Sequence, residues 1–139
     1  MKLSRHDIQK LEDYWINLED YKRQMRHRER DLIEGWLESD TNIGGGKANR
    51  ISDTTGNKAT ILADDVMLQN LKRIVHTIES LYKELDNDQK TIVDMRYWDQ
   101  KNHCYEWEDI ADRLYMSRNK VLRKRNALIK ETAKRTGWV

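Results

Sequence analysis

Apolar side chains recur every three or four residues between Ala59 and Asp86, and this period constrains the fold more than any other feature of the chain. The apolar positions of this stripe are Ile61, Leu68, Leu71, Val75, Ile78, Tyr82 and Leu85. This spacing places them on one face of an α-helix, which turns once in about 3.6 residues. The chain contains no proline that would interrupt such a helix. The pattern therefore predicts a long amphipathic helix in the middle of the chain.

A second apolar stripe lies near the N-terminus, over roughly Ser4 to Glu38. Its members, which recur every seven residues, are Leu11, Leu18, Met25 and Leu32. This spacing predicts one long N-terminal helix. Arg28 and Gly35 interrupt the stripe, so a long coiled coil is not required. Two interpretations stay open: the helix packs against its own chain, or it pairs with a second copy.

Residues 39–58 separate the two helical segments and are rich in Gly, Asn, Asp, Ser and Thr, with three consecutive glycines from Gly44 to Gly46. These residue types favour turns and bury little apolar surface, so we expect a flexible linker. Lys47 follows the glycines, but the spacing does not match a phosphate-binding loop. The predicted organisation is an N-terminal helical segment (1–38), a linker (39–58) and a second helical domain (59–139).

The composition favours an all-α protein. Leu, Glu, Lys, Arg and Gln dominate, and these residues have high helix propensity. The single cysteine, Cys104, excludes an intrachain disulfide and fits a reducing cytoplasm. No apolar run is long enough to span a bilayer, and the N-terminus lacks the apolar core of a signal peptide. We therefore expect a cytoplasmic protein without a membrane partner.

The last third of the chain has the pattern of a helix-turn-helix. A helix over about Glu106 to Leu114 is followed, after Tyr115 and Met116, by a helix over about Arg118 to Thr136. Small Ala111 lets a second helix approach closely, and we expect Tyr115 and Met116 to form a short connection with an apolar plug. The Ser117 hydroxyl is suited to cap the second helix. That helix has its apolar positions at Val121, Leu122, Leu128 and Ile129.

The second of these helices is strongly basic. The net charge of the chain is only +2, but Arg113 to Arg135 contains nine Lys or Arg and one acid, Glu131, so the other residues together carry −6. A solvated surface helix usually mixes charges of both signs, and this imbalance favours a polyanion as the partner. We expect five residues to face the major groove of DNA: Arg118, Asn119, Lys120, Arg123 and Lys124. We expect four to lie near phosphates: Ser117, Lys130, Lys134 and Arg135.

This part of the chain resembles the fourth DNA-binding region of bacterial sigma factors. The resemblance covers about Leu68 to Trp138, and it is carried by Arg96-Tyr97, Asp109-Ile110-Ala111, Leu114 and the residues from Ser117 to Val121. It implies a four-helix module that reads a promoter element through its helix-turn-helix. Glu106 departs from the pattern, because Ser or Thr usually caps the first helix of the motif.

The whole chain is similar to phage late-operon transcriptional activators of the RinA and ArpU type. The similarity rests on the N-terminal helical segment, the Gly-rich link, the stretch Asp53-Thr54-Thr55-Gly56 and the sigma-like C-terminal module. The proline often found after the residue corresponding to Asp53 is absent. The resemblance implies a prophage regulator in Gram-positive bacteria that activates late packaging and structural genes. Its partners would be double-stranded promoter DNA and host RNA polymerase.

Other functions have weaker support in the sequence. A phage small terminase subunit also binds DNA and oligomerises, but its helix-turn-helix is N-terminal. An enzyme would need converging acids, whereas Asp64-Asp65 and Glu108-Asp109 are adjacent on helices and suit helix N-termini. His103-Cys104 lacks the further ligands of a metal site. We expect no catalytic residue, metal or cofactor. The basic stretch from Tyr21 to Arg30 leaves open a solvated face, a phosphate contact or a protein partner.

Overall fold

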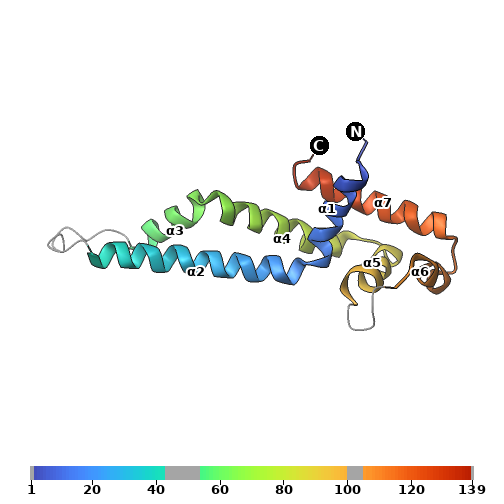
Figure 1. Cartoon of the computed structure of the whole chain (residues 1–139), viewed down its shortest axis with the longest axis horizontal. Coiled ribbons are helices and arrows are strands. Elements are labelled where there is room, and N and C mark those ends of the chain that lie inside the picture. Colours follow the sequence, from blue (N-terminus) through green and yellow to red (C-terminus); the bar gives the residue numbers. More distant parts are fainter. Residues whose placement is uncertain (1, 43–53, 100–104, 139) are drawn as a thin grey trace. The chain divides into compact units, whose positions relative to one another are not determined.

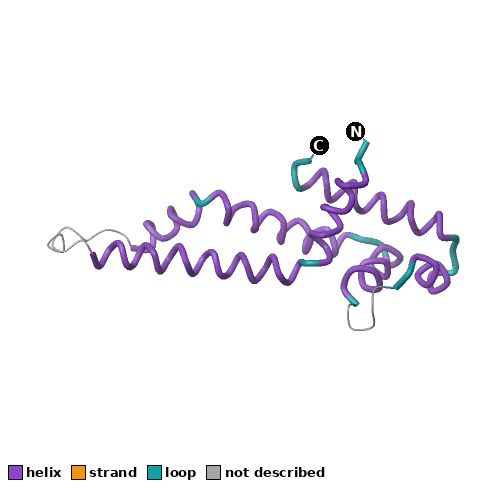
Figure 2. The backbone as a smooth tube through the Cα atoms, in the orientation of Figure 1, coloured by secondary structure: helices purple, strands orange, loops and turns teal. Residues whose placement is uncertain are grey.

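The structure, a computed structural model, describes residues 2–42, 54–99 and 105–138, and the side chains of residues 38–42 and 54–56 are not described. Within these ranges the chain is all-helical, with seven α-helices, one π-helical turn and no strand (Figures 1 and 2). The prediction of an all-α protein is thus confirmed for the described residues. The helices divide into two compact units, Glu19–Arg73 in one and Met1–Leu18 with Ile74–Val139 in the other.

The N-terminal apolar stripe lies on two helices, α1 (Arg5–Ile16) and α2 (Leu18–Asn42), and the prediction of one long helix was wrong. α1 begins with a capping box between Ser4 and Asp7. It ends at Asn17, whose side-chain amide donates to the Asp13 carboxylate. The backbone N–H of Asn17 still donates to the Asp13 carbonyl, so Asn17 is the C-cap at which α1 ends.

The unit Glu19–Arg73 is a pair of helical segments, because α2 lies beside α3 (Thr54–Asp64) and the first residues of α4 (Val66–Glu84) (Figure 1). Arg28 donates two hydrogen bonds to Asp65, at 3.0 and 2.7 Å. Asp65 also caps α4 by accepting from the Leu68 N–H at 2.8 Å, which separates α3 from α4. α2 and α3 extend into the predicted linker, at residues 39–42 and 54–58 respectively. Residues 43–53 of the linker lie outside the described residues.

The other unit contains the C-terminal helices and α1. After α4 come α5 (Asn87–Val93), the π-helical turn η2 (Asp94–Trp98), α6 (Trp107–Leu114) and α7 (Arg118–Arg135). Asp86 caps α5 by accepting from the Gln89 N–H. The fully buried side chains are apolar apart from Thr132, and they include Leu11, Trp15, Ile78, Ile92, Tyr97, Ile110, Val121, Leu128 and Ile129. α1 packs against α7 and η2, so this compact unit includes the first residues of the chain.

The buried face of α1 is held by hydrogen bonds to distant residues. The Trp15 indole donates to the Thr132 hydroxyl on α7 at 3.0 Å, and Thr132 in turn donates to the Leu128 carbonyl at 2.8 Å. The Trp98 indole donates to the Trp15 carbonyl at 2.9 Å. Each of these donors has an acceptor, so the hydrogen bonds offset the cost of removing these polar groups from water. α1 thereby supports the inner face of α7.

Candidate nucleic-acid interface

α6 and α7 are joined by three residues, Tyr115 to Ser117. The Met116 N–H donates to the Ala111 carbonyl at 3.1 Å, and the Ser117 hydroxyl accepts from the Lys120 N–H at 3.2 Å. Ser117 is thus the N-cap of α7, as predicted. The methionine packs against a core cluster of α5, α6 and α7, whereas the Tyr115 side chain is 96% exposed. The expected apolar plug therefore consists of Met116 alone.

The buried face of α7 fixes which of its residues reach solvent. Val121, Leu128 and Ile129 are buried, as their spacing predicts, whereas Leu122 is only half-buried. Thr132 and Ala133 are also buried. Six of the nine predicted DNA-facing residues have exposed side chains and, among the described residues, no carboxylate at ion-pair distance: Ser117, Asn119, Lys120, Arg123, Lys130 and Lys134. Within the described residues, α7 thus presents a basic outer surface opposite an apolar inner one.

Arg118 is exposed but paired. Its guanidinium Nε lies 3.0 Å from Oε1 of Glu108 in the first turn of α6, and both side chains are more than half exposed. The ion pair crosses the turn between the two helices. Because it is solvated on both sides, it contributes little to stability. Phosphate oxygens can therefore compete with Glu108 for this arginine.

Lys124 points toward α5 and not into open solvent. Its ammonium lies 3.4 Å from carboxylate oxygens of both Asp86 and Asp88, and its side chain is 26% exposed. Partial burial opposes protonation, but the two carboxylates outweigh it and raise the pKa of Lys124 above its ordinary value. The predicted groove contact at this position would have to compete with two aspartates of the same chain.

Arg135 is similarly engaged. Its guanidinium contacts Glu131 one turn earlier on α7, with Nε 2.9 Å from Oε1, and it also pairs with Glu84 at the end of α4. These hydrogen bonds raise the pKa of Arg135. Arg135 therefore ties the C-terminal end of α7 to α4, and a phosphate there would meet a partly neutralised side chain.

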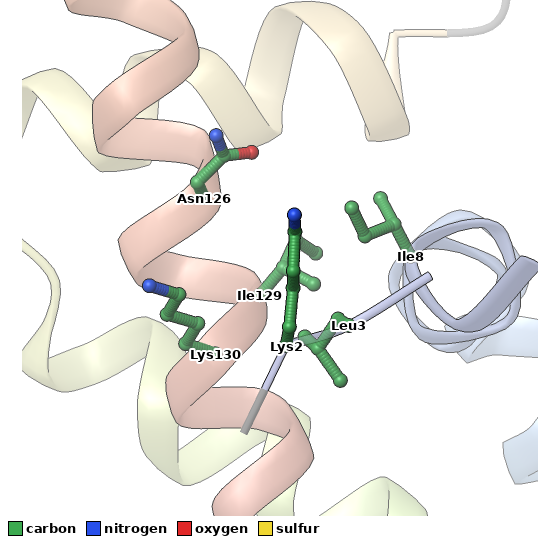
Figure 3. Close-up of a pocket in the computed structure, with 6 residues that line it drawn as sticks. All are labelled: Lys2, Leu3, Ile8, Asn126, Ile129 and Lys130. Atoms are coloured by element: carbon green, nitrogen blue, oxygen red, sulfur yellow. The ribbon is translucent and has the colours of Figure 1, made fainter. Parts of the chain in front are cut away.

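A hollow beside α7 brings in residues that the sequence pattern did not single out. Lys2, Leu3 and Ile8 line one side of it, and Asn126, Ile129 and Lys130 of α7 line the other (Figure 3). Its volume is about 440 Å³. Leu3, Ile8 and Ile129 supply apolar side chains, while Lys2, Asn126 and Lys130 are exposed. The segment that leads into α1 thus brings a second lysine, Lys2, to the hollow that Asn126 and Lys130 line.

Arg125 is the basic residue of α7 that faces inward. Its guanidinium lies 3.2 Å from Oε2 of Glu12 on α1 and 5.1 Å from the centre of the Trp107 ring. Arg96 contacts the same ring at 4.8 Å and donates to the Tyr105 carbonyl at 2.7 Å. Cation–π contacts of this kind favour a fixed ring orientation. Arg125 therefore belongs to the support of α7, and the count of basic residues alone could not distinguish it from the residues predicted to face DNA.

The remaining candidates in the sequence are distributed differently. In the basic stretch Tyr21 to Arg30, Arg28 is committed to Asp65, whereas Arg23, Arg26 and Arg30 are exposed. His103 and Cys104 lie outside the described residues. Over the part of the chain that is described, no group of three His, Cys, Asp or Glu side chains could hold a metal ion. In the same ranges, no helix has the length and apolar character needed to cross a bilayer.

The comparisons with known proteins place the chain in a family. Residues 6–134 match the family described as "Protein of unknown function (DUF722)", which covers most of the chain, so the protein belongs to this family. The search of curated proteins found no match, and neither did the search of solved structures. The family description carries no activity.

Proposed function

We propose that this protein is a sequence-specific DNA-binding transcriptional regulator in which α6, the turn and α7 form a helix-turn-helix. The observation that supports this most directly is the two-sided character of α7. Its inner face is buried, and its outer face, starting at the Ser117 cap, exposes Arg118, Asn119, Lys120 and Arg123. A recognition helix enters the major groove by its N-terminal residues, which is where this exposed set lies.

The hydrogen-bond donors of each exposed side chain determine which group of the DNA it can contact. Arg118, Lys120 and Arg123 can donate to the acceptors of guanine, and Asn119 can pair with the edge of adenine. Lys130 and Lys134, nearer the C-terminal end of α7, are suited to phosphates. We add Lys2 and Asn126 to the phosphate group, because they share a hollow with Lys130. Lys124 and Arg135 have a secondary role in this proposal, since carboxylates of the chain already hold them.

The narrower function is a phage or prophage late-gene activator that acts with host RNA polymerase. The resemblance of Leu68 to Trp138 to the promoter-reading region of sigma factors supports this, and so does the similarity to activators of the RinA and ArpU type. Under this proposal the helices from α4 to α7 form the sigma-like module, and the residues of the predicted linker connect it to α2. The helices outside the helix-turn-helix would then supply surfaces for polymerase or for a second copy.

The test begins with selection of a preferred sequence from random double-stranded DNA. Fluorescence anisotropy titrations then compare the selected DNA with shuffled DNA of equal length over a series of salt concentrations. We expect tight binding to the selected DNA that weakens as salt rises. Asn119→Ala should reduce the preference for the selected DNA by about 1–3 kcal/mol. Lys134→Ala should weaken binding to both DNAs alike and lower the salt slope by about 0.9.

Lys83→Ala is the matched control, because this exposed lysine lies on α4. Its binding should equal that of the wild type. Weak and equal binding of the wild type to all DNAs would contradict a sequence-specific regulator. A ring-shaped oligomer in light scattering, combined with such binding, would favour a DNA-packaging protein of the small-terminase kind.

A further inference from the structure

Tyr115 combines two features that the packing of the chain does not explain. Its side chain is 96% exposed, the most of the large apolar side chains exposed in the described residues. Its backbone has φ 54° and ψ 44°, and it is the one non-glycine residue with positive φ in the described ranges. Glycine or asparagine occupies this left-handed conformation at lower cost. An aromatic residue is therefore held in a strained conformation without burying its ring.

The turn does not need the aromatic ring to hold its shape. The neighbouring Met116 supplies the apolar contact with the core, and its N–H donates to the Ala111 carbonyl. Ser117 supplies the cap of α7. The Tyr115 N–H donates to the Asp112 carbonyl, a bond that any residue other than proline could make. The side chain is thus free to meet a molecule outside the chain.

The position of Tyr115 indicates what that molecule is. It lies three residues before Arg118, at the end of α7 that would enter the major groove. When a helix enters the groove by its N-terminus, the residues just before it lie at the wall of the groove, where the sugars and phosphates are. The phenol has a hydroxyl that donates to phosphate and a ring that covers apolar sugar atoms.

We propose that Tyr115 contacts the DNA backbone beside the groove that α7 enters, with its ring against a deoxyribose and its hydroxyl donating to a phosphate oxygen. This inference rests on the DNA-binding function proposed above. A backbone contact carries no sequence information, so it strengthens binding to all sequences. The phenol is neutral and displaces no counterion, so it leaves the salt slope unchanged.

The experiment compares Tyr115→Asn and Tyr115→Phe with the wild type in thermal unfolding and in anisotropy titrations with selected and shuffled DNA. Tyr115→Asn should melt at a higher temperature, because asparagine relieves the strain at positive φ. It should nevertheless bind both DNAs at least about threefold more weakly, with an unchanged salt slope. Tyr115→Phe should melt like the wild type and lose part of the affinity, since only the hydroxyl is removed.

Two controls separate this inference from the proposed function. Lys120→Ala tests the helix-turn-helix itself, and Lys83→Ala on α4 changes an exposed residue outside the proposed interface. If Lys120→Ala weakens binding but Tyr115→Asn binds like the wild type, the Tyr115 contact is overturned. A lower melting temperature for Tyr115→Asn would also overturn it, because the ring would then stabilise the chain itself. Failure of the wild type to bind any DNA overturns both.

Discussion

The hydroxyl of Tyr97 donates a 2.6 Å hydrogen bond to Oε2 of Glu12, a residue 85 positions earlier in the chain. The same carboxylate oxygen lies 3.2 Å from Arg125 of α7. Tyr97 is almost completely buried, and burial, followed by the nearby negative charge of Glu12, raises the pKa of its phenol well above 10. Glu12 therefore links α1 to η2 and to the helix that carries the candidate interface.

We expect removal of this carboxylate to destabilise the protein strongly. In Glu12→Ala, Arg125 and Tyr97 both lose their partner in a largely buried site, which should lower the free energy of unfolding by about 3–5 kcal/mol. Tyr97→Phe removes one hydrogen bond to a charged group and should cost about 1.5–3 kcal/mol. Urea unfolding followed by circular dichroism measures both values. Glu19→Ala, at an exposed carboxylate, is the control, and equal stability of Glu12→Ala and Glu19→Ala would contradict this role.

Two lysines one helical turn apart on α7 should have separable roles. Lys124 pairs with Asp86 and Asp88, whereas Lys120 is exposed. Lys124→Met should lower the free energy of unfolding by up to about 1 kcal/mol, as expected for a partly exposed ion pair. Lys120→Met should change it by less than about 0.5 kcal/mol, while reducing the preference for the selected DNA more than Lys124→Met does. Equal stability of the two variants would contradict the assignment of Lys124 to the fold.

Glu108 should oppose DNA binding. Its carboxylate holds Arg118 and places a negative charge beside the proposed groove contacts. In the wild type, Arg118 must leave its ion pair with Glu108 before it can contact DNA. Glu108→Gln removes this ion pair, so the affinity for DNA should rise by about two- to fivefold, which corresponds to the free energy of an exposed ion pair. Stability should remain close to that of the wild type.

Anisotropy titrations with both DNAs measure the affinity of Glu108→Gln. Glu34→Gln, an exposed glutamate on α2, is the control for the change in net charge. Weaker binding by Glu108→Gln than by the wild type would show instead that Glu108 positions Arg118 for its contact.

The sequence predicted those parts of the site that depend on neighbours along the chain. The Ser117 cap follows from a hydroxyl placed before a helix, and the burial of Val121 and Leu128 follows from helical spacing. The ion pairs of Lys124 with Asp86 and Asp88, and that of Arg135 with Glu84, could not be predicted in this way. Their partners on α4 and α5 are tens of residues away in sequence, and only the packing of these helices brings the carboxylates within reach.

The boundaries of the helices were harder to predict than their existence. Asn17 and Asp65 lie inside apolar stripes whose period continues past them, so periodicity alone predicts unbroken helices. At Asp65 the carboxylate accepts from the Leu68 N–H and caps α4, while Asn17 is the C-cap of α1. The exposure of Tyr115 was also missed, because its apolar character suggested a plug. The Asp65 cap is a local choice between side-chain and backbone hydrogen bonds, and hydrophobic patterning carries no information on it.

The ion pair between Arg28 and Asp65 should make the stability of the Glu19–Arg73 unit depend on pH. The hydrogen bonds from Arg28, and then that from the Leu68 N–H, lower the pKa of Asp65. A carboxyl whose pKa is lower in the folded than in the unfolded state contributes stability above its unfolded pKa, about 3.9 for aspartate, and this contribution is lost as the pH falls through the folded pKa.

Asp65→Asn should therefore be less stable than the wild type at about pH 7, and the difference should shrink below about pH 4, where the wild-type carboxylate also takes up a proton. Urea unfolding at a series of pH values measures this difference, with hydrogen exchange of the α2 and α4 amides reporting on the unit itself. Asp64→Asn is the matched control, because this exposed neighbour ends α3 and does not cap α4. A difference between Asp65→Asn and the wild type that stays constant from neutral to acidic pH would show that the amide disrupts the capping geometry, and that the charge of Asp65 is not what stabilises the pair.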